Sequence, residues 1–365
     1  MPVLQDVITY FNQWIPSDIA WEKDNTGLQM GNPGQEINGI LLAVDLTEEV
    51  LNQALENRFN LIITHHPFFF HSIKSINFSS ASGRMVYKAI QNNISVYTAH
   101  TNLDFVVGGV STVLAESLGL TQISLLKPHE SYNRKLSVFV PETHAEKVHQ
   151  ALSEAGAGQI GNYDSCSFQV KGKGTFKGNE FSNPVIGKPL QLETVEEIRL
   201  EMIYPKWKES AILKALRASH PYEEIAYDII PLLNKMSDFG FGSKGFLPQK
   251  MKLKDWLEIV KTTLKAENIR YSGDLDQEVH QIAVCGGSGS ELSGLAKASG
   301  ADCFVTSDLK YHSFFESDPT FSLVDAGHYE TENITLNKLK SQLQNEFSSL
   351  KIELTTIITN PVHFY

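Results

Sequence analysis

Short apolar runs that stop at polar residues constrain the fold of this chain more than any other feature. Residues 39–44 (GILLAV), 61–64 (LIIT) and 94–97 (ISVY) are runs of this kind, and segments with helical spacing lie between them. A continuous apolar run is typical of a strand that is buried on both faces. The alternation of such runs with helices predicts a parallel sheet that carries helices on its faces.

The C-terminal part of the chain repeats this rhythm. Three further apolar runs are each followed by polar residues, and an amphipathic helix and a last strand come after them. We therefore expect an α/β fold in which the two ends of the chain form one three-layer core of sheet and helices. The runs are 281–284, 303–306 and 321–324, the helix carries Leu336, Leu339 and Leu343, and the last strand is expected over 351–357.

The middle of the chain contains an internal repeat instead. Residues 138–141 (VFVP) and 202–205 (MIYP) lie 64 positions apart, and each precedes a segment with helical spacing. Two strand–helix–strand units in succession are typical of a ferredoxin-like α+β module. We therefore expect residues 133–233 to be an inserted domain, and residues 1–132 and 234–365 to be the two halves of the core.

Composition excludes several classes of function. The chain has 42 Asp and Glu against 31 Lys and Arg, a net charge of −11, so we expect no nucleic-acid partner. No apolar run approaches the roughly 18 residues of a membrane span, and the first residues do not resemble a signal peptide, so we expect no membrane association. Three scattered cysteines do not form a disulfide framework. These features predict a cytoplasmic protein.

The pair His65-His66 directly follows the second apolar run. Neighbouring residues on a regular strand point to opposite faces, so both imidazoles cannot face one metal from such a strand. Because Pro67 ends the strand, the two imidazoles could instead serve two neighbouring metals. The alternative is one imidazole bonded to the backbone and one exposed.

Two further segments offer similar side chains. His328 and Glu332 are four residues apart at the start of a helix, so they share one helical face, a common arrangement of metal ligands. The alternative is a solvated first helical turn. Asp104 offers a carboxylate near the end of the third strand, where an Asx turn is the alternative. With the histidine pair, these residues make three imidazoles and two carboxylates, the composition of a two-metal site.

A glycine-rich segment, residues 286–289 (GGSG), follows the strand over 281–284. Its backbone N–H groups could bind a phosphate at a helix start, although the spacing matches no nucleotide-binding fingerprint. A tight turn from strand to helix is the alternative. Ser288 has no predictable base partner, so the sequence does not indicate a Ser-His-Asp triad.

Several motifs, in this order along the chain, resemble the NGG-one-interacting-factor-three-like family, which is widely labelled GTP cyclohydrolase I type 2. Glu22 and Lys23 separate Trp21 from Asp24, where many members have Trp-Asp-Asn. The middle of the chain, with the segment 219–224, resembles the PII-like or CutA-like insert of longer bacterial members. The matching motifs are 21–31, 45–47, 63–67, 100–104, 306–308 with 311–312, and 327–332.

The resemblance implies a toroidal homohexamer with two divalent metal ions in each subunit. It implies that Glu332 bridges the two ions. His100, Asp308 and His312 match motif positions, and we expect them to hold a ligand imidazole in one tautomer or to order a water; for His312 the alternative is a surface position on a helix. The implied ligands are His65, His66, Asp104, His328 and Glu332.

Two functions are consistent with such a site. The first is a metal-dependent hydrolase acting on a nucleotide-like or other small anionic substrate, because two divalent ions and two carboxylates leave about two positive charges. The second is a non-enzymatic metal chaperone, or a scaffold whose insert senses a small ligand. Imidazole and carboxylate ligands suit zinc, iron or manganese.

Overall fold

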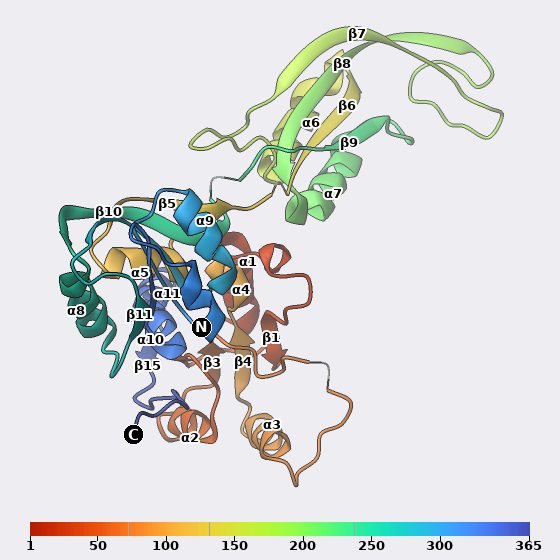
Figure 1. Ribbon diagram of the computed structural model, residues 1–365. Helices are drawn as coiled ribbons and strands as arrows, with labels where there is room; N and C mark the ends of the chain where they lie inside the picture. The colour runs from red at the N-terminus through yellow and green to blue at the C-terminus, as the bar shows by residue number, and fades with distance from the viewer. Residues whose placement is uncertain (72, 131, 237) are drawn as a thin grey trace. The chain divides into compact units, whose positions relative to one another are not determined.

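The structure is a computed structural model that describes residues 1–71, 73–130, 132–236 and 238–365. The chain forms two compact units (Figure 1). One unit joins Met1–His129 to the C-terminal stretch that ends at Tyr365, and the other is Glu130–Met236. Both units combine sheets with helices, so the predicted α/β class is confirmed.

A five-stranded sheet of the first unit contains the apolar runs of the N-terminal part. Four strands run parallel, with β15 next to β2, β2 next to β3, and β3 next to β4. β1 pairs antiparallel with β4 at the edge. In sheet order the strands are β1 (Gly27–Met30), β4 (Ser95–Thr98), β3 (Leu61–Thr64), β2 (Gly39–Ala43) and β15 (Lys351–Leu354).

Both faces of this sheet are covered by helices, as its continuous apolar strands require. Leu42 and Ile63 pack in one core with residues of α1 and α11. Their strand neighbours Leu41 and Ile62 pack in a second core with residues of α2 and α3, because successive side chains on a strand point to opposite faces. These helices are α1 (Leu4–Trp14), α2 (Glu48–Glu56), α3 (Ala81–Gln91) and α11 (Thr335–Glu346).

A six-stranded sheet contains most of the C-terminal strands. β12, β13 and β14 run parallel, and β11, β10 and β5 pair antiparallel with their neighbours. Helices α5 and α8 contribute Leu114 and Trp256 to the core against this sheet. In order the strands are β11 (Arg270–Ser272), β14 (Ser322–Asp325), β13 (Cys303–Ser307), β12 (Glu278–Ser288), β10 (Gly240–Lys252) and β5 (Thr121–Pro128).

The remaining elements of this unit are short apart from α5 and α8. In the described parts of the chain, no helix combines the length and the apolar character needed to cross a bilayer. The helices are α4 (Thr101–Asp104), α5 (Val110–Ser117), α8 (Leu253–Leu264), α9 (Ser293–Ala298) and α10 (His328–Asn333), and the 3₁₀ turns are η1 (Ser17–Ile19), η4 (Ser290–Leu292) and η5 (Tyr311–Glu316).

Each end of the chain contributes one strand to the sheet that the other end mainly forms. β15, from the C-terminal end, pairs with β2 in the five-stranded sheet, with Lys351 opposite Gly39. β5, from the N-terminal part, pairs with β10 in the six-stranded sheet, with Lys127 opposite Phe241. Each sheet is therefore completed by a strand from the other end of the chain.

The second unit, Glu130–Met236, extends three residues beyond the expected 133–233 at each end. Its four-stranded antiparallel sheet has the order β7-β8-β6-β9, and α6 and α7 pack on the face that carries Leu136, Val138 and Ile198. Along the chain the elements are β6 (Asn133–Pro141), η2 (Glu142–His144), α6 (Ala145–Glu154), β7 (Phe168–Lys177), β8 (Leu192–Pro205), η3 (Lys206–Lys208), α7 (Glu209–Ser219) and β9 (Tyr227–Pro231).

Candidate metal centre

The histidine pair lies immediately beyond the end of the central strand β3. The His65 N–H donates to the carbonyls of Ala43 and Val44 at 3.2 and 3.1 Å, and the His66 N–H donates to Val44 at 2.9 Å. The backbone is thereby held against the end of β2, while the rings leave the strand geometry and lie with centroids 5.1 Å apart. The structure therefore places both imidazoles at one edge of the sheet, as the predicted end of the strand at Pro67 allows.

His328 and Glu332 come from α10, which follows β14. Gly327 precedes the helix with φ +91°, and a Cβ there would lie 2.1 Å from the Glu330 carboxylate, so this turn requires glycine. His328 and Glu332 lie one helical turn apart, and the His328 Nε2 atom is 3.1 Å from Glu332 Oε1. The shared helical face expected from their spacing is present.

Five side chains converge where these segments meet. Glu332 is central: its Oε2 lies 3.2 Å from His66 Nε2, and its Oε1 lies 3.5 Å from His65 Nε2. Asp104 Oδ1, from the end of α4, lies 3.6 Å from the same His65 nitrogen. His328 Nε2 is 3.2 Å from His66 Nε2. The structure thus brings together His65, His66, Asp104, His328 and Glu332.

Three atoms of this cluster are buried without a hydrogen-bond partner: His65 Nε2, Asp104 Oδ1 and Glu332 Oε2. Unpaired buried polar atoms are costly and call for an explanation, of which an ion is one. All three are donor atoms that a divalent metal accepts. The cluster therefore fits a metal centre.

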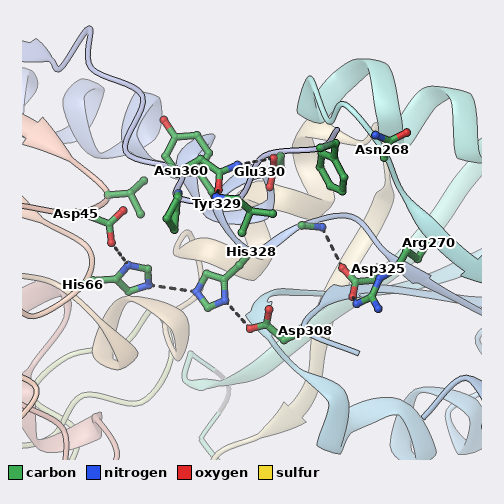
Figure 2. A pocket seen from close by; sticks show the side chains of 15 residues that line it. Asp45, His66, Asn268, Arg270, Asp308, Asp325, His328, Tyr329, Glu330 and Asn360 are labelled. Atoms are coloured by element: carbon green, nitrogen blue, oxygen red, sulfur yellow. Dashed lines mark hydrogen bonds and ion pairs between the residues drawn. The ribbon is translucent and has the colours of Figure 1, made fainter. Parts of the chain in front are cut away.

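The outer nitrogen of each imidazole has a fixed partner. His65 Nδ1 is 2.8 Å from the carbonyl of Ala99, and His66 Nδ1 is 2.7 Å from Asp45 Oδ1. His328 Nδ1 is 2.7 Å from Asp308 Oδ2, a bond that Figure 2 shows. A proton on each Nδ1 that is donated to these acceptors leaves each Nε2 lone pair directed at the shared space.

Asp308 takes the supporting place that its motif position suggested. It follows β13 with φ +56°, a left-handed conformation that aspartate tolerates better than most residues. His312 does not join the cluster: it is exposed on η5, where its ring lies 5.2 Å from Tyr311 and 6.2 Å from Phe315. For His312 the surface alternative describes the structure.

The pKa values follow the charge distribution. Burial raises the pKa of Glu332, but the imidazoles of His65, His328 and His66 outweigh it and hold that pKa well below its usual range. Burial, together with the charge of Glu332, raises the pKa of Asp104 to about 6 against the lowering effect of the neighbouring imidazoles, of which His65 has the largest. Glu332 is thus the carboxylate held as an anion by three imidazoles.

The pKa values of all three ligand imidazoles shift in the opposite sense. For His65, burial lowers the pKa, but the charges of Glu332 and Asp104 outweigh it and raise the pKa. For His66, burial is outweighed by the interactions with Asp45 and Glu332, and the pKa rises to about 10. For His328, burial is outweighed by Glu332 and Asp308, and the pKa rises to about 9. The cluster therefore favours positive charge, whether it comes as protons or as metal ions.

A second His–Asp pair adjoins the cluster. His100 Nδ1 lies 2.8 and 2.9 Å from the two carboxylate oxygens of Asp24, which also accepts from the Thr101 N–H at 3.2 Å. These bonds lower the pKa of Asp24 to about 2 against the opposing effect of burial. The His100 ring lies 5.3 Å from that of His65 and 5.5 Å from that of His66.

Trp21, the first residue of the resemblance, does not reach this pair with its ring. Its N–H donates to Thr101 Oγ1 at 3.1 Å, and its half-exposed indole packs edge-on against Phe105 and Phe241. Asp24 therefore holds His100 despite the two-residue insertion after Trp21.

Most of the glycine-rich segment lies in a strand. Gly286 to Ser288 continue β12, and Gly289 alone makes the tight connection to η4, which begins at Ser290. Gly287 has φ +63°, and a Cβ there would lie 2.2 Å from Glu332 Oε1. Its N–H donates to Thr331 Oγ1 at 3.0 Å. Gly287 therefore makes room for the central carboxylate of the cluster, a role that the sequence did not indicate.

A cavity of about 440 Å³ opens beside His66 and His328 (Figure 2). The last residues of the chain form part of its wall. The Asn360 amide donates to Glu330 Oε1 at 2.9 Å, and Thr359 Oγ1 donates to the Asp45 carboxylate at 2.8 Å. The C-terminal segment is therefore bonded to the carboxylate that holds His66.

The supporting roles of three residues were not predicted from the sequence. Asp45 directly follows the run 39–44, at the carboxyl end of a strand where ligands bind, and lies in the matching motif 45–47, but nothing nearby in the sequence marks His66 as its partner. Asp24 lies in the matching motif 21–31, but it supports His100 across 76 residues. Thr359 lies outside the matching motifs and reaches Asp45 across 314 residues.

Fold and cluster together define an α/β protein with a candidate metal centre at the strand ends. A model of the family described as Duf34/NIF3 (NGG1p interacting factor 3) matches residues 2–361. Among curated relatives, the GTP cyclohydrolase 1 type 2 homolog of Halalkalibacterium halodurans is 39% identical over 361 residues, which cover 98% of this chain and 96% of the relative. The homolog from Bacillus subtilis is 39% identical over 366 residues, with 99% and 98% covered.

A solved structure supports the same assignment. The Bacillus cereus protein related to NIF3 matches with a TM-score of 0.86 and 39% identity, and the match covers 100% of this chain and 99% of that chain. The chain belongs to the Duf34/NIF3 family.

Proposed function

We propose that the chain binds two divalent metal ions, with Glu332 as the bridge between them. The observation that carries this proposal is the convergence of three imidazole Nε2 atoms on two carboxylates, with buried donor atoms left unpartnered. Five ligands exceed what one open site needs, and the two oxygens of Glu332 face different imidazoles. The proposed ligands are His65, His66, Asp104, His328 and Glu332.

The metal is zinc, iron or manganese in this proposal. Imidazole nitrogen and carboxylate oxygen suit all three ions. Cys285 is buried, and burial raises the pKa of its thiol well above the usual value.

We further propose that the protein is a metal-dependent hydrolase of a nucleotide-like or other small anionic substrate. Two divalent ions would supply Lewis acidity that activates water and polarises the bond to be broken. With two carboxylates against them, about two positive charges remain, which favours an anion in the adjoining cavity. The name of the relatives, GTP cyclohydrolase 1 type 2 homolog, agrees with a nucleotide substrate.

The chain's own residues have separate tasks in this proposal. Ala99, Asp45 and Asp308 hold the three ligand imidazoles in one tautomer. His100, held by Asp24 through Nδ1, presents Nε2 near the histidine pair, where it can orient a water or hold a proton.

A second candidate is a metal chaperone or a ligand-sensing scaffold without catalysis. This candidate is favoured because the carboxylates around the cavity already have hydrogen-bond or ion-pair partners. Asp45 and Asp308 are bonded to ligand histidines, Asp325 accepts from Arg270 and from the Leu309 N–H, and Glu330 accepts from Asn360. None of these four is free to act as a general base.

One experiment separates these functions. The protein is purified without oxygen, its metals are measured by elemental analysis, and it is incubated with nucleoside mono-, di- and triphosphates while products are followed by chromatography. Turnover that is lost in Glu332→Gln and kept in Glu346→Gln, a change at an exposed glutamate that ends α11, supports the hydrolase. Metal at about two ions per subunit without turnover of any nucleotide supports the chaperone or scaffold, and a stoichiometry near one contradicts the dinuclear centre.

The proposal extends to the insert and the assembly. The order β-α-β-β-α-β and the sheet order β7-β8-β6-β9 support a ferredoxin-like, PII-like or CutA-like insert. The homohexamer is the closed assembly that the family resemblance implies, and exposed Tyr311 and Phe315 are candidate subunit contacts. The free thiols of all three cysteines agree with a cytoplasmic location.

A further inference from the structure

A second cavity, of about 720 Å³, lies within the unit Glu130–Met236. It occupies the face of the β7-β8-β6-β9 sheet that the helices leave uncovered. Val138 and Ile198 pack against α6 and α7, so their strand neighbours Phe139 and Glu197 point to the other face. Both of these neighbours line the cavity, together with β7, the connection from β7 to β8, and residues 222–226.

Glu197 is the distinctive side chain of this cavity. It is only 9% exposed, and its Oε1 accepts a hydrogen bond from the Tyr222 hydroxyl at 3.2 Å. Its Oε2 lies above Gly174, where a Cβ would be 2.0 Å away. Gly172, directly opposite Glu197 on β7, has open space above it. Gly174 therefore makes room for the carboxylate, and Gly172 leaves a bare strip of backbone beside it.

No cation balances this carboxylate in the described residues, since neither a lysine nor an arginine forms an ion pair with Glu197. Arg199, the nearest arginine along β8, is bonded to Glu201 and to Ser137 Oγ instead. A buried carboxylate without a cation is costly, and a cation in the cavity would remove that cost.

Three lysines of β7 also line the cavity with their backbone: Lys171, Lys173 and Lys177. They alternate with Gly172, Gly174 and Phe176, so their side chains point to the opposite face, where Lys171 pairs with Glu142 and Lys173 with Glu196.

The side chains that face the cavity suit an organic cation. The rings of Phe176 and Tyr222 meet edge to face with centroids 5.8 Å apart, and aromatic faces attract cations. Glu223 and Glu224 add negative charge, and Glu223 Oε1 accepts from the Asn183 N–H at 2.9 Å. That bond holds the connection between β7 and β8 next to the cavity.

We propose that this cavity binds a small organic cation whose guanidinium or ammonium head pairs with Glu197. A planar guanidinium donates two parallel hydrogen bonds to a carboxylate, and the glycine strip admits a flat group beside Glu197. The apolar part of the ligand packs against Phe176 and Val170, which share this face of β7.

The test compares two probes of the same shape on the full chain, with chelator present so that the metal centre takes no part. Butylguanidinium carries the charge, and butylurea is its neutral counterpart; binding is measured by calorimetry and by the shift in melting temperature. Glu197→Gln removes the charge inside the cavity. Glu196→Gln is the matched control, because Glu196 is the adjacent residue on β8, is 65% exposed, and pairs with Lys173.

Butylguanidinium is expected to bind saturably, with a dissociation constant in roughly the millimolar range or below, as suits a ligand of few atoms. Butylurea is expected not to bind. Glu197→Gln should weaken binding by about tenfold or more, and Glu196→Gln by less than about twofold, because only Glu197 makes the charge-assisted bonds.

Three results would overturn the proposal: no saturable binding to the unmodified chain, equal binding of butylurea, or unchanged binding in Glu197→Gln. If Glu197→Gln fails to fold, Gly172→Val decides, because Gly172 lies opposite Glu197 with open space above it and a side chain there would occupy the place of the ligand head. Unchanged binding in that variant contradicts the site. If Glu197→Gln changes the mass of the assembly but not the binding of butylguanidinium, this face of the sheet contacts another copy of the chain, and the proposal is wrong.

Discussion

Replacing Glu332 with glutamine tests the central feature of the proposed metal centre. The change keeps the size of the side chain and removes its charge, and the amide nitrogen cannot act as a ligand. Glu332 Oε1 lies 3.1 Å from His328 Nε2, and Oε2 lies 3.2 Å from His66 Nε2, so one carboxylate serves both ends of the cluster.

The size of the effect follows from Coulomb's law. Two unit charges about 4 Å apart interact by about 4 kcal/mol at an effective dielectric constant of 20. That energy corresponds to roughly a thousandfold in affinity, and desolvation reduces the net effect. We therefore expect Glu332→Gln to weaken binding of at least one ion by about a hundredfold or more, and to empty that position after dialysis against a chelator.

Elemental analysis of dialysed protein gives the stoichiometry, and circular dichroism shows whether the fold persists. Glu330→Gln is the matched control, because Glu330 lies on the same helix and bonds to Asn360 rather than to a histidine. Two ions per subunit retained in Glu332→Gln would refute the bridging role. An equal loss of metal in the control would show that the helix itself, rather than the bridge, was disturbed.

Four further predictions can be checked separately. Gly287→Ala should lose metal and stability together, because its Cβ would lie 2.2 Å from Glu332 Oε1. The control is Gly119→Ala, which at φ +77° with open space carries only the backbone cost of about 1–2 kcal/mol. Equal melting temperatures for the two variants would contradict this account. Metal affinity should fall as pH drops from 8.5 to 6, because the pKa values of His66 and His328 are raised to about 10 and about 9 and protons compete with the metal. The fall should be up to about tenfold per pH unit for each proton that the metal displaces, and a competition titration at several pH values measures the affinity. In the metal-free protein the raised pKa of His66 contributes stability that is complete below its ordinary value of about 6.5 and is lost as pH rises through about 10, so the melting temperature should be lower at pH 10 than at pH 6. Light scattering should give the mass of a hexamer, and a monomer at micromolar concentration would contradict the proposed assembly.

Local patterns in the sequence predicted the places where strands end. The run 61–64 becomes β3 and stops where His65 and His66 begin, because an apolar strand buried on both faces must end before polar residues can reach an open edge. The helix that carries His328 and Glu332 is likewise local, since its four-residue spacing sets a shared face.

Partners that are distant in sequence were beyond such patterns. Asp24 supports His100 across 76 residues, and Thr359 reaches Asp45 across 314. The role of Gly287 was missed for the same reason. By composition Gly287 looks like part of a turn, but it lies in β12, and glycine is needed there because Glu332 approaches it.

The sequence by itself determined the α/β class, the strand ends and the residue types that gather there, because these depend on periodicity and on local backbone chemistry. Only the tertiary structure decided which of those ends meet. β15 joins the N-terminal sheet and β5 joins the C-terminal one, and the contact between His66 and His328 joins residues 262 positions apart. Such contacts depend on how apolar faces pack across the whole unit, and packing between distant segments leaves no periodic signal in the chain.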